Sequence, residues 1–300
     1  MSHDAPWTVG RLLQWTAEYL KRHGSDSPRL DAEVLLAHAR GCQRIELYTA
    51  FDDVPGEDVR AGFREMVRRR AEGMPVAYLV GHREFYSLDF HVTPDVLIPR
   101  PETECLVLRL IELGRQRGSG PLAICDVGTG SGNIAVAAAK HLPTAQLTAI
   151  DASPAALEVA RRNAHRHGVA DRIEFVVGNL LSALREESQF DFVVSNPPYV
   201  KESEFESLAA DVRNYEPRAA LVAGPRGTEI VERLAPQAAD HLRPGGHLLL
   251  EVSPTTHDAV VALLAADPRF EPPVTIRDFS RLPRVVQARK LAGYAPRGRI

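Results

Sequence analysis

From residue 123 onward, short apolar runs rich in β-branched residues alternate with longer segments of helical periodicity. The runs predict strands and the segments predict helices. The expected strands are Ala123–Val127, Gln146–Asp151, Arg172–Val177, Phe190–Ser195, His247–Val252, Val274–Phe279 and Arg284–Ala288, and the expected helices are Asn133–His141, Pro154–His167 and Thr228–Leu242. Because strands that alternate with helices form βαβ units, we expect an α/β fold with a doubly wound, mostly parallel seven-stranded sheet.

The N-terminal part of the chain has helical periodicity and no strand signal. A helix is predicted after Thr8, a candidate N-cap, and two more over Arg29–Ala39 and Glu57–Ala71. Alternation over residues 83–93 then predicts a short hairpin. We therefore expect a small all-helical domain over 1–78, a hairpin linker over 79–99 and the sheet domain over 100–300.

The composition of the 300-residue chain is that of an ordinary globular protein, with 44% apolar and 25% charged residues. No apolar stretch reaches the ~18 residues of a membrane span, and the N-terminus lacks a signal-peptide pattern. Cys42, Cys105 and Cys125 have no Cys-x-x-Cys spacing, which favours free thiols in a reducing compartment. We expect a soluble, cytoplasmic protein, and the formal net charge of −3 disfavours a dedicated nucleic-acid binder.

A glycine-rich segment, Asp126-Val127-Gly128-Thr129-Gly130-Ser131-Gly132, follows the first expected strand and precedes a helix. Glycines there allow the main chain to approach a ligand closely, and a helix N-terminus offers free N–H groups. The dinucleotide-binding spacing Gly-x-Gly-x-x-Gly would need glycine at position 133, where the chain has Asn133. No Lys-Ser/Thr pair follows either, so the loop predicts a ligand site without an evident grip for phosphates.

Asp151 ends the second expected strand, about twenty residues after this loop. A carboxylate at that place can accept hydrogen bonds from both ribose hydroxyls of a nucleoside. The alternative role of helix N-cap fits Ser153 better, because Ser153 directly precedes Pro154 at the start of the next helix. A nucleoside ligand without a pyrophosphate points to S-adenosyl-L-methionine as cofactor, with S-adenosyl-L-homocysteine as product.

The tetrapeptide Asn196-Pro197-Pro198-Tyr199 follows a buried-strand pattern and is expected beside the cofactor. Its prolines remove two N–H donors, so carbonyl oxygens and the Asn196 amide oxygen are left as acceptors. These acceptors suit the N–H groups of a planar nitrogen, such as an amide or an exocyclic base amine, on which Tyr199 can stack. We expect methyl transfer to such a nitrogen, promoted by positioning and by acceptors that respond to developing positive charge.

With these motifs the chain resembles the HemK family, the protein-(glutamine-N5) methyltransferases that modify class-1 peptide chain release factors. The resemblance covers nearly the whole chain. Its segments are Leu30–His38, Arg83–Phe85, Phe90–Val92, Leu97–Glu104, Asp126–Gly132, Asp151, Asn196–Tyr199 and Glu216–Leu221. It implies a class I S-adenosylmethionine-dependent methyltransferase fold that methylates the glutamine of the release-factor Gly-Gly-Gln loop and so supports translation termination.

The resemblance also implies roles for individual residues. Cofactor contacts would come from Gly128, Thr129, Gly130, Ser131, Gly132, Asp151, Leu180 and Asn196. The glutamine side chain would be held by Asn196, Pro197, Pro198 and Tyr199, with Asn196 and Tyr199 as the catalytic residues. The helical domain would dock the release factor. Apart from the resemblance, we expect a monomer that binds neither membrane nor nucleic acid.

The chain departs from the family pattern at three places. Asn179 stands where the family usually has an acid near the adenine, Ser253 lies in a segment that replaces Glu-x-Gly-x-x-Gln, and Ser280 stands where glycine is common. Arg100 and Glu102 have two open roles. They either close over the cofactor or form a salt bridge at the N-terminus of the next helix.

Three other functions stay open. Close relatives of the family methylate a glutamine of a large-subunit ribosomal protein, but they usually lack the Pro-Glu-Thr-Glu of Pro101–Glu104. Methylation of adenine N6 or guanine N2 suits the same acceptors, although the charge balance disfavours it. A non-catalytic binding module for a translation factor conflicts with the intact glycine loop and Asn196.

A metal site is not expected, because His165 and His167 face different directions on a helix.

Overall fold

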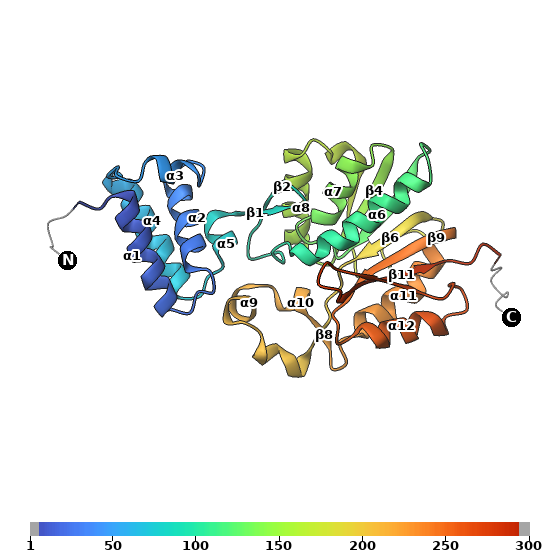
Figure 1. Cartoon of the computed structure of the whole chain (residues 1–300). Helices are drawn as coiled ribbons and strands as arrows, with labels where there is room; N and C mark the ends of the chain where they lie inside the picture. The colour runs from blue at the N-terminus through green and yellow to red at the C-terminus, as the bar shows by residue number, and fades with distance from the viewer. Residues whose placement is uncertain (1–5, 294–300) are drawn as a thin grey trace. The chain divides into compact units, whose positions relative to one another are not determined.

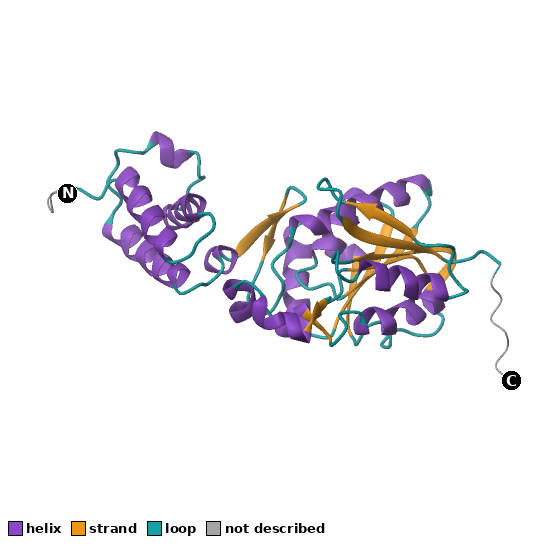
Figure 2. Cartoon of the chain, turned by 60° about the horizontal axis from the view of Figure 1, so that its bottom comes forward, coloured by secondary structure: helices purple, strands orange, loops and turns teal. Residues whose placement is uncertain are grey.

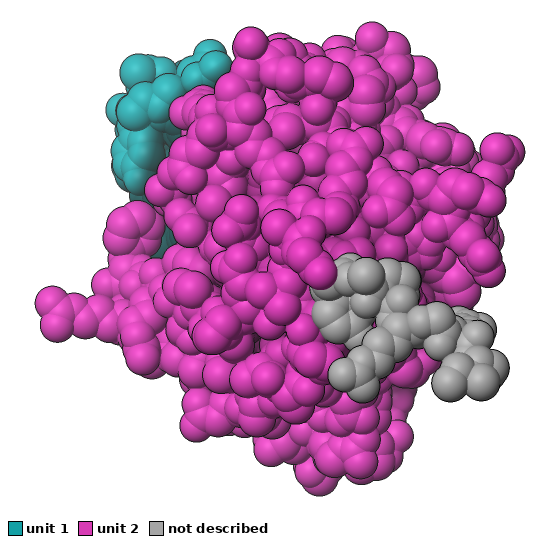
Figure 3. Space-filling model, turned by 90° about the vertical axis from the view of Figure 1, so that its right-hand side faces the viewer, with its two compact units in different colours: residues 1–82, 209–215 teal, residues 83–208, 216–300 magenta. Residues whose placement is uncertain are grey.

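The computed structural model describes residues 6–293, which divide into two compact units (Figure 3). Unit 1 comprises the described residues up to His82 together with Ala209–Tyr215, and unit 2 comprises Arg83–Leu208 and the described residues from Glu216 onward. Unit 1 therefore includes a segment far along the chain that no local pattern assigns to it. Among the described residues, no helix is long and apolar enough to cross a lipid bilayer.

Unit 1 consists of helices. Those that surround its apolar core are α1 (Val9–Arg22), α2 (Pro28–Arg40), α3 (Glu46–Thr49), α4 (Glu57–Ala71) and α5 (Val76–Val80) (Figure 1). The short helix α9 (Ala210–Tyr215) also belongs to unit 1 but has no buried residue. Thr8 caps α1 by accepting the Arg11 N–H at 3.3 Å, as its sequence position predicts, and Gly41 ends α2 in the left-handed conformation. Leu13 and Leu35 are completely buried in the core, so the apolar faces of α1 and α2 stabilise the unit.

Unit 2 contains a seven-stranded sheet with the order β10-β11-β9-β6-β3-β4-β5. Figure 2 shows strands in orange among the purple helices. The strands are β3 (Leu122–Val127), β4 (Ala145–Asp151), β5 (Ile173–Val177), β6 (Phe190–Ser195), β9 (Leu242–Glu251), β10 (Val274–Arg277) and β11 (Pro283–Arg289). Pairing is parallel from β5 across to β9 and antiparallel for β11 and β10. The chain runs outward from β3 to β5 and then resumes at β6 on the other side of β3, which is a topological switch point. The predicted fold class is confirmed.

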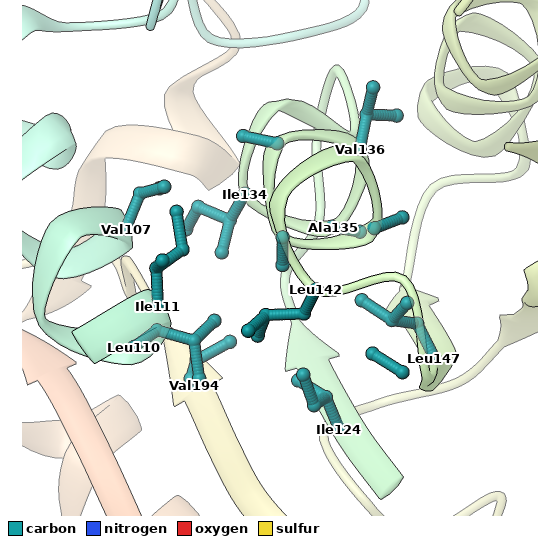
Figure 4. Close-up of a cluster of buried hydrophobic side chains, with 14 of the residues drawn as sticks. Val107, Leu110, Ile111, Ile124, Ile134, Ala135, Val136, Leu142, Leu147 and Val194 are labelled. Atoms are coloured by element: carbon teal, nitrogen blue, oxygen red, sulfur yellow. The ribbon is translucent and has the colours of Figure 1, made fainter. Parts of the chain in front are cut away.

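Helices cover both faces of this sheet. They are α6 (Glu104–Gln116), α7 (Asn133–His141), α8 (Pro154–Arg166), α11 (Glu229–His241) and α12 (His257–Ala266). Side chains of α6, α7 and α8 enter one buried cluster, and those of α11 and α12 enter a second. In Figure 4, Leu110 and Ile111 of α6 point into the first cluster together with Ile134 of α7 and Val194 of β6. Burial on both faces explains why the central strands are almost continuously apolar.

Short elements connect these layers. They are β1 (His82–Phe85), β2 (Leu88–His91), η1 (Pro101–Thr103), η2 (Ala170–Arg172), β7 (Val200–Lys201), η3 (Glu202–Ser207), α10 (Arg218–Leu221) and β8 (Val222–Gly224). The hairpin expected over residues 83–93 is formed by β1 and β2. Its turn residues Tyr86 and Ser87 have φ values of 50° and 57°, the left-handed pair that a two-residue hairpin turn requires. Phe85 and Phe90 are buried in the first cluster, which fixes the hairpin to unit 2.

Candidate active site

Three loops that follow parallel strands lie next to one another at the switch point. The last residue of β3, Val127, is level with Ile150 of β4 on one side and with Ser195 of β6 on the other. The glycine loop after β3 therefore lies between Asp151 and Asn196 at the carboxyl edge of the sheet. Ligands of doubly wound sheets bind in the crevice at this place.

The glycine loop depends on main-chain conformations that only glycine adopts easily. Gly128, Gly130 and Gly132 have φ values of 72°, 55° and 78°. The N–H groups of Gly128 and Thr129 both donate to the Ile150 carbonyl, at 2.8 and 3.0 Å. A side chain at Gly128 or Gly130 would meet no protein atom within 4 Å, so open space for a ligand lies above the loop.

Asp126, the residue before the end of β3, stabilises the glycine loop through two hydrogen bonds. Its Oδ2 accepts the Thr129 hydroxyl at 2.7 Å and the Ala135 N–H at 3.2 Å. The carboxyl group is completely buried, and this burial raises its pKa to about 7 despite both hydrogen bonds. Its other oxygen, Oδ1, has no hydrogen-bond partner within residues 6–293.

Asp151 points both carboxylate oxygens at main-chain donors. Oδ2 accepts the Gly130 N–H and Oδ1 accepts the Ser153 N–H, each at 2.9 Å. Each oxygen keeps a further acceptor position, and Asp151 lines the cavity described below. The N-cap role belongs to Ser153, whose hydroxyl accepts the Ala156 N–H at 3.2 Å, as predicted.

The segment Asn196–Tyr199 forms the loop between β6 and β7. The side-chain nitrogen Nδ2 of Asn196 donates to the Thr103 hydroxyl at 3.2 Å. The amide oxygen Oδ1 is therefore directed away from Thr103, and Asn196 lines the cavity. Tyr199 is half-buried, and burial, followed by the nearby Glu251 carboxyl, raises the pKa of its phenol to about 12. Tyr199 is therefore neutral at physiological pH.

These loops surround a cavity of about 430 Å³. Of the residues expected at the site, those that line it are Gly128, Thr129, Gly130, Ser131, Asp151, Leu180, Asn196 and Pro198. Within the described chain, Gly132, Pro197 and Tyr199 are not part of the lining. Gly132 instead faces α8, where an added Cβ would lie 3.1 Å from the Cβ of Ala160, so its small size allows α7 and α8 to pack closely.

Leu180 has a left-handed main chain, with a φ of 57°. For a residue with a branched side chain this conformation costs on the order of 1 kcal/mol. The neighbouring Leu181 N–H donates to the Gln237 side chain at 2.9 Å, which holds the turn in place. Strain of this kind is typical of ligand-binding loops, and Leu180 lines the cavity.

The three departures from the family pattern have clear places. Asn179 lines the cavity, and its Oδ1 accepts a hydrogen bond from Arg233 at 3.0 Å, so that acceptor is already engaged. Ser253 accepts the Thr256 N–H at 3.2 Å ahead of α12. Ser280 lies in the turn before β11, where the left-handed conformation falls on Arg281.

Arg100 lines the cavity and forms an ion pair with Glu216 at 2.5 Å. The Glu216 side chain is 1% exposed and also accepts the Ile98 N–H at 3.4 Å. Glu102 is exposed. Arg100 therefore lies beside the cavity and is paired with a carboxylate other than Glu102, while its role toward the cofactor stays a prediction.

Sequence reasoning missed Thr103 and Glu251 as parts of this region. Thr103 is almost completely buried and lines the cavity, and Glu251 ends β9 with 1% exposure. The available signal for Thr103 was its place inside the matched segment Leu97–Glu104, and for Glu251 its place beside the departing Ser253 segment; neither signal assigns a role. No cluster of three metal-binding side chains occurs among the residues that the structure describes.

The cavity suits a nucleoside ligand. Its apolar lining includes Val96, Leu97, Ile134 and Ile230, which fit a flat base and an aliphatic chain. Among its charged lining residues, Asp151 and Asp95 are acidic and Arg100 is basic, so the cavity offers no cluster of cations for phosphates. S-Adenosyl-L-methionine meets these requirements.

Two family models match the chain: the PrmC N-terminal domain at residues 11–81 and the methyltransferase small domain at residues 110–213. The release factor glutamine methyltransferase of Rhodopirellula baltica is 48% identical over 291 residues, which cover 96% of this chain and 98% of that protein. The enzyme of the same name from Koribacter versatilis is 42% identical and covers 94% of this chain and 99% of its own length.

Solved structures share the fold. The hMettl16 catalytic domain, solved with the MAT2A 3′UTR hairpin 6, has a TM-score of 0.53 at 16% identity and covers 77% of this chain and 83% of its own. A methyltransferase from Pyrococcus furiosus has a TM-score of 0.50 at 20% identity, with coverage of 75% and 97%. These identities speak for the fold alone. The two sequence relatives, in contrast, are 48% and 42% identical over nearly their full length. This chain therefore belongs to the release factor glutamine methyltransferase family.

Proposed function

We propose that the protein transfers a methyl group from S-adenosyl-L-methionine to the side-chain amide nitrogen of the glutamine in the Gly-Gly-Gln loop of class-1 peptide chain release factors. The observation that carries this proposal is the Asn196 amide. Its Nδ2 is bound to Thr103 while the residue lines the cavity beside the glycine loop, which leaves Oδ1 to accept an N–H of the substrate.

The cofactor would be held by the glycine loop, Asp151 and Leu180. When bound, it supplies an electrophilic methyl group on a positively charged sulfur. The free acceptor positions of Asp151 suit ribose hydroxyls, and the open space above Gly128 and Gly130 admits a ligand close to the main chain.

The glutamine amide would be held by acceptors alone. Asn196 Oδ1 and the carbonyls of the Pro197–Pro198 segment can accept both N–H groups, and neither proline offers a competing donor. An amide nitrogen is a weak nucleophile, so these acceptors act by fixing the nitrogen and by stabilising positive charge as it develops there. Tyr199 stays protonated and, although it is not among the residues that line the cavity, is the aromatic ring on which the planar group would stack.

Docking of the release factor is assigned to unit 1. Large apolar side chains are exposed there, with Ile45 at 67%, Tyr48 at 51% and Trp15 at 48%. Apolar and aromatic side chains of this kind supply the central contacts of protein interfaces. The expected cytoplasmic location and monomeric state remain predictions that fit this substrate.

Mass spectrometry of a purified release factor, incubated with the protein and S-adenosyl-L-methionine, tests the proposal. One added methyl group on the glutamine of the Gly-Gly-Gln loop is expected, and none on a release factor whose glutamine is replaced by glutamate. Cofactor binding without methylation of the release factor would contradict the proposal that the release factor is the substrate. The large-subunit ribosomal protein and then nucleic acid would be tried next.

A further inference from the structure

The side-chain amide of Asn196 must have one particular orientation to serve the proposed function. A glutamine amide brings N–H donors, which only the oxygen Oδ1 can accept. Rotation of the Asn196 amide by half a turn would exchange Oδ1 and Nδ2. The Nδ2 donors of Asn196 would then face the N–H donors of the substrate. Thr103 alone does not prevent this rotation, because a hydroxyl can accept from Nδ2 or donate to Oδ1.

The buried carboxyl group of Glu251 lies near the Thr103 hydroxyl. The residue before it, Leu250, is level with Ser195 in the sheet, so Glu251 ends β9 at the height of Asn196. The Thr103 hydroxyl is near enough to lower the pKa of the Glu251 carboxyl, but neither carboxylate oxygen forms a hydrogen bond of normal geometry within residues 6–293. A buried carboxylate without partners is costly, and Thr103 is the hydroxyl placed to donate to it.

The other charged and titratable groups that face Glu251 are Arg284, Arg100, Glu102, Tyr199 and Cys105. Both arginines have carboxylate partners of their own. Arg284 binds Asp278 at 3.0 Å, and Arg100 binds Glu216 at 2.5 Å. Because these cations are engaged, burial dominates and raises the pKa of Glu251 to about 7.

We propose that Glu251 and Thr103 are positioning residues that fix the orientation of the Asn196 amide. Ionised Glu251 can only accept, so Thr103 donates its hydroxyl proton to Glu251 and must accept from Asn196 Nδ2. Asn196 Oδ1 is thereby directed to the substrate. Protonated Glu251 can donate to Thr103, which can then donate to Oδ1 and allow the unproductive orientation. This inference rests on the proposed function and assigns no proton transfer to Glu251.

The first test observes Asn196 without any turnover. The chain has five asparagines, so isotopic labelling of asparagine gives five side-chain amide signals in an NMR spectrum, and Asn196→Asp identifies the one from Asn196. We expect this signal to move with pH between about 6 and 8, and Glu251→Gln to abolish the movement. A signal that does not respond to pH in the unmodified protein, or that still titrates in Glu251→Gln, would overturn the proposal.

The second test measures activity on the release factor. We expect Thr103→Val to lower kcat on the order of tenfold, with the cofactor Kd unchanged, because it removes one hydrogen bond that directs Asn196. Thr103→Ser should restore kcat to within about twofold. Thr148→Val is the matched control, since Thr148 is a half-buried threonine of β4 outside the cavity.

The pH profile completes the test. In the unmodified protein kcat should fall as the pH drops through about 7, and in Glu251→Gln this dependence of kcat on pH should be absent. Equal losses in Thr103→Val and Thr103→Ser would indicate a purely structural role for Thr103. Failure of the unmodified protein to methylate any release factor would contradict the proposed function, whereas the NMR result tests the positioning role separately.

Discussion

Asn163 binds both polar main-chain atoms of His91: its Oδ1 accepts the His91 N–H at 2.7 Å, and its Nδ2 donates to the His91 carbonyl at 2.9 Å. The same Nδ2 donates to the Ser131 carbonyl at 2.8 Å. One completely buried side chain of α8 thus connects the end of the β1–β2 hairpin with the glycine loop. The shape of the ligand loop therefore depends on a residue outside it.

Asn163→Ala should lower the free energy of unfolding by about 3 kcal/mol, because three main-chain groups lose their partner in a buried place. Urea denaturation measures the change. Asn214→Ala, at an exposed asparagine, is the control and should stay within about 0.5 kcal/mol of the unmodified protein. Similar effects of the two substitutions would show that the Asn163 contacts do not stabilise the fold.

Gly130→Ala should weaken cofactor binding at least tenfold, since the new Cβ would project from the loop into the open space above it. Gly118→Ala is a matched control, with a φ of 85° and no atom within 4 Å of the added Cβ. Both substitutions should cost about 1 kcal/mol of stability through their positive φ. Isothermal titration with S-adenosyl-L-methionine measures the cofactor affinity of both variants. A normal affinity in Gly130→Ala would show that the loop is not part of the cofactor site.

Asn196→Ala should leave the fold and most of the cofactor affinity intact. Loss of one preorganised polar contact with the reacting nitrogen should cost about 3 kcal/mol of transition-state stabilisation, or roughly a hundredfold in kcat/KM. Quantitative mass spectrometry of the release factor measures this loss. Turnover near that of the unmodified protein would refute the role of Asn196.

Asp126→Asn should change how stability depends on pH. Burial raises the pKa of Asp126 from its ordinary value to about 7, so the folded protein holds a proton that the unfolded chain has lost between about pH 4 and pH 7. Stability from this group is therefore greatest at low pH and is lost as the pH rises through 7. Between pH 5 and pH 8, the unmodified protein should lose about 3 kcal/mol more than Asp126→Asn. Parallel pH dependences in urea denaturation would contradict the raised pKa.

Most of the sheet could be predicted because its signals are local. Phe190–Ser195 and Asn133–His141 have the bounds that their patterns predict, since a buried β-branched run and a helix after glycine are marked in the sequence. α12 was missed because His257–Ala266 is apolar on nearly all sides, so no helical period stands out.

The candidate site was predictable where a motif follows a strand, and not where tertiary contacts create it. Asp151 and Asn196 lie at strand ends, so the parallel order of the sheet brings them to one edge. Glu251 becomes part of this region only through the register of β9 with β6, and Thr103 only through its contact with Asn196. Neither relationship has a trace in the local sequence.

The membership of Ala209–Tyr215 in unit 1 has a consequence for modularity. Tyr215 donates its hydroxyl to the Glu72 carbonyl at 3.1 Å, so this late segment is held by the early helices. The chain therefore passes between the units three times, after His82, after Leu208 and after Tyr215. Unit 1 therefore cannot be exchanged as an N-terminal segment alone. A gene fusion that replaces only residues 1–82 leaves Ala209–Tyr215 of unit 1 behind. That segment lies in the chain between Tyr199 and Pro217, a residue that lines the cavity.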